Sequence, residues 1–171
     1  MWSFERSSRA AFAGVMAALL SACGFHLRGQ AELLFETLYI PGASPLAVEL
    51  KRNVAAASKA RLVDSPGEAQ AVFGFTQELR EKIILSFSAA GRVSEYQLRS
   101  RVGFRVTDAK GAQVYLPTSE ILLTRDMAYS DAQVLAKETE EALLYRDMQR
   151  DMVQQIIRRL VAAKPALPAV E

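Results

Sequence analysis

The sequence contains very few of the residues that metal sites and nucleophilic enzymes use. Its 171 residues include one cysteine, Cys23, and one histidine, His26. A single histidine has no second imidazole beside it to complete a zinc site. A glycine-rich phosphate loop and a serine in a nucleophile elbow are also missing. Adjacent carboxylates such as Glu140 and Glu141 suit a solvated helix surface. We therefore predict that the protein is not an enzyme and has no catalytic residue, metal site or cofactor.

The sequence also lacks an excess of charge of one sign. Its formal net charge is +2. Without residues 1–22 it keeps 149 residues, with 19 Lys and Arg against 18 Asp and Glu. Proteins that bind nucleic acid through their overall charge are strongly basic. The balance therefore argues against a nucleic-acid partner and is compatible with a local basic patch.

Near the start, an apolar run is too short to be a transmembrane helix. It covers 11 residues, 10–20, whereas a spanning helix needs about 20. Arg6 and Arg9 precede the run, and the small residues Ser21 and Ala22 follow it. A basic start, a short apolar stretch and a small-residue cleavage site are typical of a secretory signal peptide. We assign residues 1–22 to this signal peptide.

The end of this segment resembles a bacterial lipobox. Leu20 stands three positions before the expected cleavage site, two small residues follow, and Cys23 comes next. We expect acyl chains such as palmitate on Cys23, and more than one chain gives stable membrane attachment. The alternative is a plain signal peptide or short membrane anchor with an incidental cysteine. That reading leaves an unpaired thiol in an oxidising compartment.

After the anchor, residues 23–164 are long enough for one domain with its own core. The first elements are a strand at 37–40 and a helix that continues to about Ala60. Ser44 and Pro45 suit the N-cap and first position of this helix. The segment 165–171, Pro-Ala-Leu-Pro-Ala-Val-Glu, is expected to be a disordered tail.

Three longer strand patterns follow, at 72–87, 93–107 and 113–125. In the first, alternation places one set of residues on a shared face: Phe73, Phe75, Leu79, Ile83, Leu85 and Phe87. In the second, an apolar set alternates with a polar set: Tyr96, Leu98, Val102, Phe104 and Val106 against Glu95, Gln97, Arg99, Arg101 and Arg105. Residues 108–111 suit a hairpin turn, and Pro117 indicates an edge or a bulge in the last strand.

A long helix at about 135–163 completes the pattern. Its apolar stripe has four-residue spacing: Leu144, Met148, Met152, Ile156 and Leu160. A one-sided stripe indicates a helix that lies on a sheet, with the methionines as core residues. We predict an α/β (α+β sandwich) domain in the order β-α-β-β-β-α. Its four-stranded mixed sheet carries both helices on one face and polar side chains on the other.

Three short segments in a fixed order carry a resemblance to a known family. They are Cys-Gly-Phe-His-Leu-Arg-Gly at 23–29, Ser-Glu-Tyr-Gln-Leu at 94–98, and Leu-Ala-Lys at 135–137 before an acidic stretch and the long helix. The segments and the order of elements resemble the LptE family of lipopolysaccharide-assembly lipoproteins. The resemblance extends over essentially the whole mature chain.

This resemblance implies a function at the outer membrane. Family members form a complex with the β-barrel protein LptD, plug the barrel from within, and assist insertion of lipopolysaccharide into the outer leaflet. The alternative is a lipoprotein scaffold or accessory subunit of another outer-membrane assembly complex.

The resemblance also implies two ligand-binding residues, Lys137 and Arg92. Lys137 matches a basic position that binds lipopolysaccharide in the family. The family's second basic position is an arginine in the turn at 88–92, where this sequence has Ser88 or Ala89, so Arg92 is expected to substitute. We expect both cations on an accessible surface, where they can bind phosphates. For Arg92 and the arginines of the 93–107 strand, a solvated sheet face is the alternative.

The assignment of the anchor gives a first prediction. Cys23→Ala should abolish acylation and leave an uncleaved or soluble precursor, because the sequence has no other cysteine. Mass spectrometry of the membrane fraction measures this directly. Gly24 is not the aspartate that commonly retains lipoproteins in the inner membrane, so we expect outer-membrane sorting. An unacylated parent protein, or a parent that fractionates with the inner membrane, would contradict the assignment.

Overall fold

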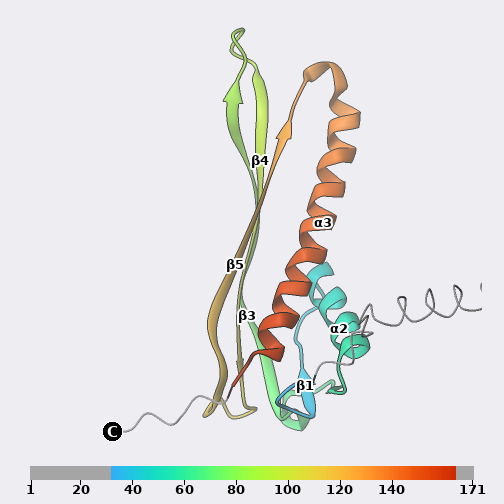
Figure 1. Cartoon of the computed structure of the whole chain (residues 1–171), viewed down its shortest axis with the longest axis vertical. Coiled ribbons are helices and arrows are strands. Elements are labelled where there is room, and N and C mark those ends of the chain that lie inside the picture. Colours follow the sequence, from blue (N-terminus) through green and yellow to red (C-terminus); the bar gives the residue numbers. More distant parts are fainter. Residues whose placement is uncertain (1–31, 165–171) are drawn as a thin grey trace, which may run out of the picture.

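A twisted sheet runs the length of an elongated molecule, and two helices lie along one of its faces (Figure 1). The computed structural model describes residues 32–164. The strands lie in the order β2-β1-β3-β4-β5. Their bounds are β1 Thr37–Tyr39, β2 Arg61–Leu62, β3 Ala71–Phe87, β4 Val93–Thr107 and β5 Val114–Ala128. The helices are α2 Pro45–Ala57 and α3 Val134–Val161, and short 3₁₀ turns cover Pro66–Glu68 and Asp131–Gln133. No helix among the described residues is long and apolar enough to cross a membrane.

The predicted α+β class, the mixed sheet and the order of the longer elements are confirmed, but the number of strands is wrong. β2 is a fifth strand, parallel to β1. It is held by hydrogen bonds from Arg61 N to Glu36 O at 2.8 Å and from Val63 N to Leu38 O at 3.1 Å. A two-residue strand is too short to show alternation, so the sequence pattern did not reveal it.

Local sequence signals place α2 correctly. Ser44 is the N-cap, its side chain accepts a hydrogen bond from Ala47 N at 3.2 Å, and Pro45 occupies the first helical position. The helix ends at Ala57, three residues before the expected end. Ser58 is extended there, and both its N–H and its hydroxyl donate to Val54 O. These bonds satisfy a carbonyl at the helix end and stop the helix.

The apolar core lies at the end of the molecule where α2 and α3 both cover the sheet. Phe73 and Phe104 stack there with ring centroids 5.3 Å apart. Four members of the expected stripe of α3 are buried as predicted, Met148, Met152, Ile156 and Leu160, whereas Leu144 is only half-buried. Between Val134 and Asp147, however, no side chain of α3 is buried. The first half of this helix therefore lies outside the core.

A bulge in β3 divides the sheet into two parts. Phe75 lies opposite Phe104, but the next pairs are Gln77 with Gly103 and Glu78 with Val102, so Thr76 is an extra residue. One inserted residue exchanges the two faces of a strand. Before the bulge, the helix-facing side of β3 is apolar. Beyond the bulge, it carries polar side chains opposite the apolar row of β4: Glu78, Arg80 and Lys82.

The bulge overturns the prediction of one continuous apolar face on β3. Phe73 and Phe75 face the helices, as expected. Leu79 and Ile83 instead lie on the open face, opposite Arg101 and Gln97. The predicted polar open face is thus found on β4 and is interrupted by apolar residues on β3. β3 has further irregularities between Ile84 and Phe87, and Pro117 lies at another one in the edge strand β5, in agreement with the sequence.

The predicted core gives a stability test. Phe104 and Met152 are fully buried on opposite sides of the core. Replacement of either residue by Ala should lower the free energy of unfolding by about 2–5 kcal/mol, because each change leaves a cavity. Arg101→Ala, on the open face, should change it by less than about 0.5 kcal/mol. Urea unfolding measures all three, and a loss below about 1 kcal/mol at both core sites would contradict the assignment of the faces.

Gly103 should be essential to the bulge. A Cβ atom at this position would clash with Thr76 Oγ1 and lie 3.4 Å from Gln77 Cβ. Gly103→Ala should therefore destabilise the protein by about 1–3 kcal/mol through overpacking. Gly74→Ala is the matched control, since a Cβ there makes an ordinary 3.7 Å contact with Arg105 Cγ. Equal unfolding free energies for the two variants would contradict this account of the bulge.

Candidate functional site

The end of the molecule farthest from β1 is built from two connections. One is the turn between β3 and β4, and the other joins β5 to α3 (Figure 1). Tyr129 N donates a hydrogen bond to Ser94 O at 2.8 Å, and this bond joins the two connections. A pocket of about 260 Å³ lies between them, lined by Ser88, Arg92, Val93, Ser94, Tyr129, Ser130, Asp131 and Ala132. The structure thus brings Arg92 beside the segment that leads to Lys137.

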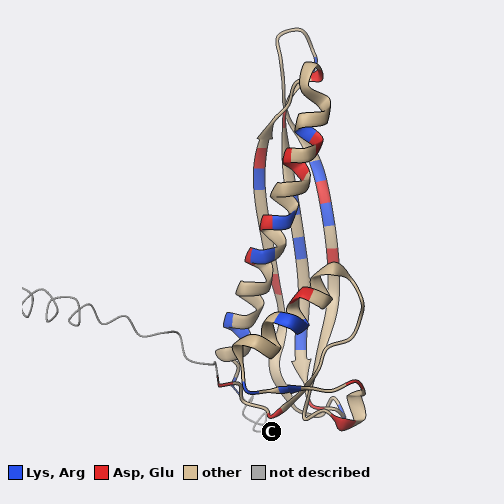
Figure 2. Cartoon of the chain, turned by 90° about the vertical axis from the view of Figure 1, so that its right-hand side faces the viewer, with Lys and Arg blue, Asp and Glu red and all other residues tan. Residues whose placement is uncertain are grey.

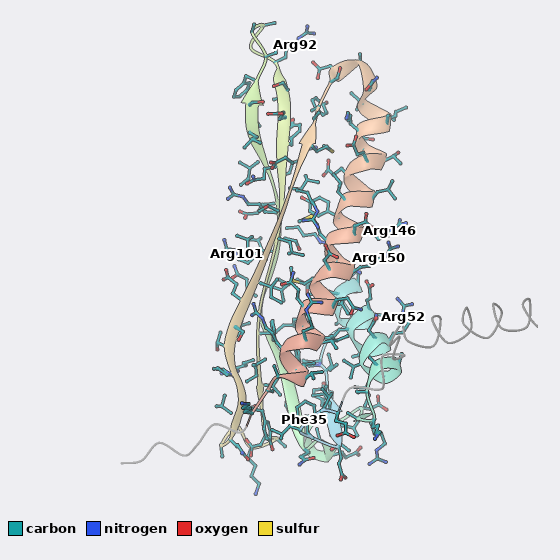
Figure 3. The ribbon with its side chains drawn as sticks, in the orientation of Figure 1. Phe35, Arg52, Arg92, Arg101, Arg146 and Arg150 are labelled. Atoms are coloured by element: carbon teal, nitrogen blue, oxygen red, sulfur yellow. The ribbon has the colours of Figure 1, made fainter. Side chains whose placement is uncertain are left out.

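The turn that carries Arg92 is closed by its own hydrogen bonds. Ser88 N donates to Arg92 O at 2.7 Å, and Gly91 N donates to Ser88 O at 2.9 Å. Gly91 has a φ of 72°, a conformation that favours glycine. The side chain of Arg92 is exposed at the tip (Figure 3). Ser88, one of the two residues at the expected arginine position, closes the turn through its backbone and hydroxyl.

Lys137 is less accessible than the sequence indicated. It lies in the first turn of α3, and its side chain is only 16% exposed. Its Nζ donates to Glu140 Oε2 at 2.8 Å. The pair is spaced i, i+3 on the helix surface, a geometry that contributes little to stability. Lys137 can therefore change partners at small cost, but its ammonium does not extend freely into solvent.

Contacts of one lysine, Lys82, hold the first half of α3 to the sheet, and the sequence pattern did not reveal them. Lys82 Nζ lies 2.6 Å from Glu141 Oε2 and 4.2 Å from the centre of the Tyr96 ring. Tyr96 and Tyr129 meet edge to face, with ring centroids 5.0 Å apart. Partial burial lowers the pKa of Lys82, but the hydrogen bond and charge of Glu141 outweigh it, so the net pKa is raised above 10.5.

Tyr145 makes a second polar link between α3 and β3. Its hydroxyl donates to Glu81 O at 2.8 Å, and the Arg80 guanidinium lies 5.5 Å from the centre of its ring. Burial, with a smaller effect of Glu141, raises the pKa of the Tyr145 hydroxyl above its usual value of 10. It remains a protonated donor at neutral pH. Beyond the core, polar contacts hold this helix.

The open face of the sheet carries paired charges. Arg101 Nη1 lies 2.7 Å from Glu120 Oε1, and Gln97 donates to Asp126 at 2.9 Å. Acidic and basic residues are also interspersed along α3 and the strands, without separating by sign (Figure 2). Within residues 32–164, no three His, Cys, Asp or Glu side chains are placed to hold a metal ion. This arrangement favours the solvated-face interpretation for Arg101.

Comparison with known families supplies the identity that the geometry alone does not. The family described as LptE, lipopolysaccharide-assembly, matches residues 35–160, which include every strand and nearly all of both helices. The chain belongs to the LptE family. A comparison with curated proteins finds no match.

Solved structures of lipoproteins share the fold. The chain is 43% identical to uncharacterized lipoprotein B from Nitrosomonas europaea, with a TM-score of 0.70 over 81% of this chain and 91% of that one. A minor lipoprotein from Acinetobacter baumannii is 24% identical, with a TM-score of 0.64 over 80% and 99% of the two chains. Rare lipoprotein B from Shewanella oneidensis is 21% identical, with a TM-score of 0.62 over 74% and 94%.

The contact between Lys82 and Glu141 gives a prediction about pH. In Glu141→Gln, the pKa of Lys82 should fall below 10.5, because burial remains while the carboxylate is lost. Glu138→Gln is the matched control, since Glu138 lines a surface pocket together with Lys82 and Glu141 but is not the carboxylate that pairs with Lys82. In the parent, the stabilisation from the raised pKa is complete below pH 10.5 and is lost as the pH rises through the folded-state value. NMR titration of the Lys82 side chain measures the pKa, and urea unfolding at increasing pH measures the loss of stability. An equal pKa in the two variants would contradict the assignment.

Proposed function

We propose that this LptE-family protein binds lipopolysaccharide and assists its insertion at the outer membrane, as the plug of an LptD-type β-barrel. The observation that carries the proposal is the match to the family over residues 35–160. The role is non-enzymatic and depends on shape, charge and attachment. The family establishes lipopolysaccharide assembly as the process; the barrel partner and the direct contact with lipopolysaccharide are our proposal.

The sheet supports the role of a plug. A barrel lumen is polar, so a domain within it needs a polar exterior. The open face meets this need in part through the pairs Arg101–Glu120 and Gln97–Asp126. The two ends of the sheet also differ in the helices that cover them, since α2 lies only over the end with the core (Figure 1). The opposite end, with Arg92, is the part that we propose meets the ligand.

The proposed ligand contacts are to the phosphates of lipopolysaccharide. Arg92 is exposed and can bind a phosphate with paired N–H donors. Lys137 would exchange its contact with Glu140 for a phosphate, at the cost of a weak surface pair. Arg92 belongs to one of the two connections that meet at this end of the molecule, and Lys137 follows the other in the first turn of α3.

Attachment completes the proposal. Acyl chains on Cys23 would hold the domain, residues 23–164, at the periplasmic side of the outer membrane. Cys23, the signal peptide 1–22, the whole motif at 23–29 and the tail 165–171 lie outside the described residues. Extraction of the acylated protein with mild detergent tests the partner. A large β-barrel that co-purifies with lipopolysaccharide would support the proposal, whereas a different assembly complex would favour the scaffold alternative.

Charge reversal tests the proposed ligand contacts. Arg92→Glu combined with Lys137→Glu should weaken binding of residues 24–171 to lipopolysaccharide far more than neutralisation of either residue, because repulsion adds to lost attraction. The matched control reverses Arg52 and Lys110, exposed cations on α2 and in the β4–β5 turn. Binding is measured with phosphorylated and dephosphorylated ligand. Equal affinity of the double variant and the parent would exclude these residues, and equal affinity for the two ligands would exclude the phosphate mechanism.

A further inference from the structure

The hairpin formed by β3 and β4 ends in a segment with almost no charge. Residues 83–94, here called the hairpin end, read Ile-Ile-Leu-Ser-Phe-Ser-Ala-Ala-Gly-Arg-Val-Ser. Arg92 is the single charged residue among these 12, and none is acidic. This composition differs from the neighbouring part of β3, where Glu78, Arg80, Glu81 and Lys82 follow one another closely.

Large apolar side chains of the hairpin end are exposed. The exposed fraction is 45% for Ile84, 48% for Leu85 and 61% for Phe87. At the same end of the molecule, Leu135 in the first turn of α3 is 79% exposed. Single exposed apolar residues are ordinary on a protein surface, but a group of them in a nearly uncharged segment indicates an interaction site.

The hairpin end also extends past the rest of the sheet. The last β5 residue to pair with β4 is Ala128, opposite Glu95. Beyond it, Phe87 still pairs with Val93, and the turn at 88–92 follows. Figure 3 shows Arg92 at the extreme tip of this projection. Phe87 is therefore close to the tip and has no β5 neighbour beside it.

We infer that the hairpin end inserts between the acyl chains of lipopolysaccharide. The inference rests on the proposed function and adds an apolar contact to it. Phe87 and Leu85 would enter the acyl layer, while Arg92 would remain at its boundary with an anionic headgroup. Burial of apolar surface among acyl chains is favourable, and a long arginine side chain can reach back to the polar boundary.

The chemistry of the hairpin end favours lipopolysaccharide over a polar protein surface as its partner. Against a polar wall, the exposed Phe87 and Leu85 would gain little, since such a surface offers no apolar partner. An anionic amphiphile offers both of the required surfaces: an acyl layer for the apolar side chains and a negative group for the one cation. Residues 83–94 themselves contribute no negative charge that would repel such a headgroup. The carboxylates beside them are Glu95, which accepts from Ser86 Oγ at 2.8 Å, and Asp131, which lines the pocket with Arg92.

A tryptophan reporter tests the location directly. The sequence has one tryptophan, Trp2, which is removed with the proposed signal peptide 1–22, so the mature chain has no background tryptophan fluorescence. Phe87→Trp then places a reporter in the hairpin end. Leu122→Trp is the matched control, because Leu122 is 44% exposed but lies on the open face of the sheet. Each acylated mature variant is reconstituted in phosphatidylcholine vesicles and titrated with lipopolysaccharide, and binding is measured separately by co-sedimentation.

We expect the reporter at position 87 to shift to shorter wavelength and to lose access to iodide when lipopolysaccharide binds. The reporter at position 122 should change little. Three results would overturn the inference while leaving the proposed function intact: binding without a change at position 87, equal changes at both positions, or a reporter at 87 already shielded in phosphatidylcholine. Absence of binding by the parent chain would instead reject the proposed function, and the inference with it.

A loss of affinity provides an independent readout. Leu85→Ser with Phe87→Ser should weaken binding to lipopolysaccharide about tenfold, since two side chains lose part of their apolar contact. Leu79→Ser with Leu122→Ser makes the same kind of change on the open face. All four positions are exposed, so both variants should fold. An equal loss in the two variants, or no loss at 85 and 87, would contradict the inference.

Discussion

The extra residue Thr76 in β3 is the constraint on which the rest of the structure depends. It exchanges the faces of the strand next to Gly103, where the missing side chain leaves room for it. Before the bulge, the sheet and both helices share an apolar core around Phe73 and Phe104. After it, β3 turns polar side chains towards α3, and the contact becomes one of charges and hydrogen bonds. One strand thereby builds both a stable end and a loosely held end.

This division suits a protein that works at a membrane surface. The core end can fold without help from a ligand, because its contacts are apolar and buried. At the other end, Lys82 binds Glu141 and Tyr145 binds the backbone of Glu81. Contacts of this kind keep α3 in place yet contribute little stability individually. The segment that we propose meets lipopolysaccharide is therefore the part of the domain whose rearrangement costs least.

Features fixed by neighbouring residues were predictable from the sequence, and features fixed by distant pairing were not. Ser44 and Pro45 determine the start of α2 locally, and the four-residue spacing of the α3 stripe requires only helix geometry. The bulge at Thr76 was hidden because apolar residues alternate on both sides of it, and only pairing with β4 shows that the face has changed. The pair Lys82–Glu141 joins positions 59 residues apart, which no local pattern indicates. At the candidate site, the sequence predicted that Arg92 lies beside the tip of the hairpin. It did not predict that Lys137 is largely buried and paired with Glu140.

The central claim is that one end of the domain is held by an apolar core and the other by polar contacts that a ligand can replace. Amide hydrogen exchange resolved along the chain tests it most directly, because exchange reports local opening. The account predicts slow exchange in β3 and β4 around Phe73 and Phe104, and fast exchange in the first half of α3. Lipopolysaccharide should then slow exchange in residues 83–94 and 134–147 only. Uniform protection along α3 without ligand, or protection by lipopolysaccharide confined to the core end, would contradict the account.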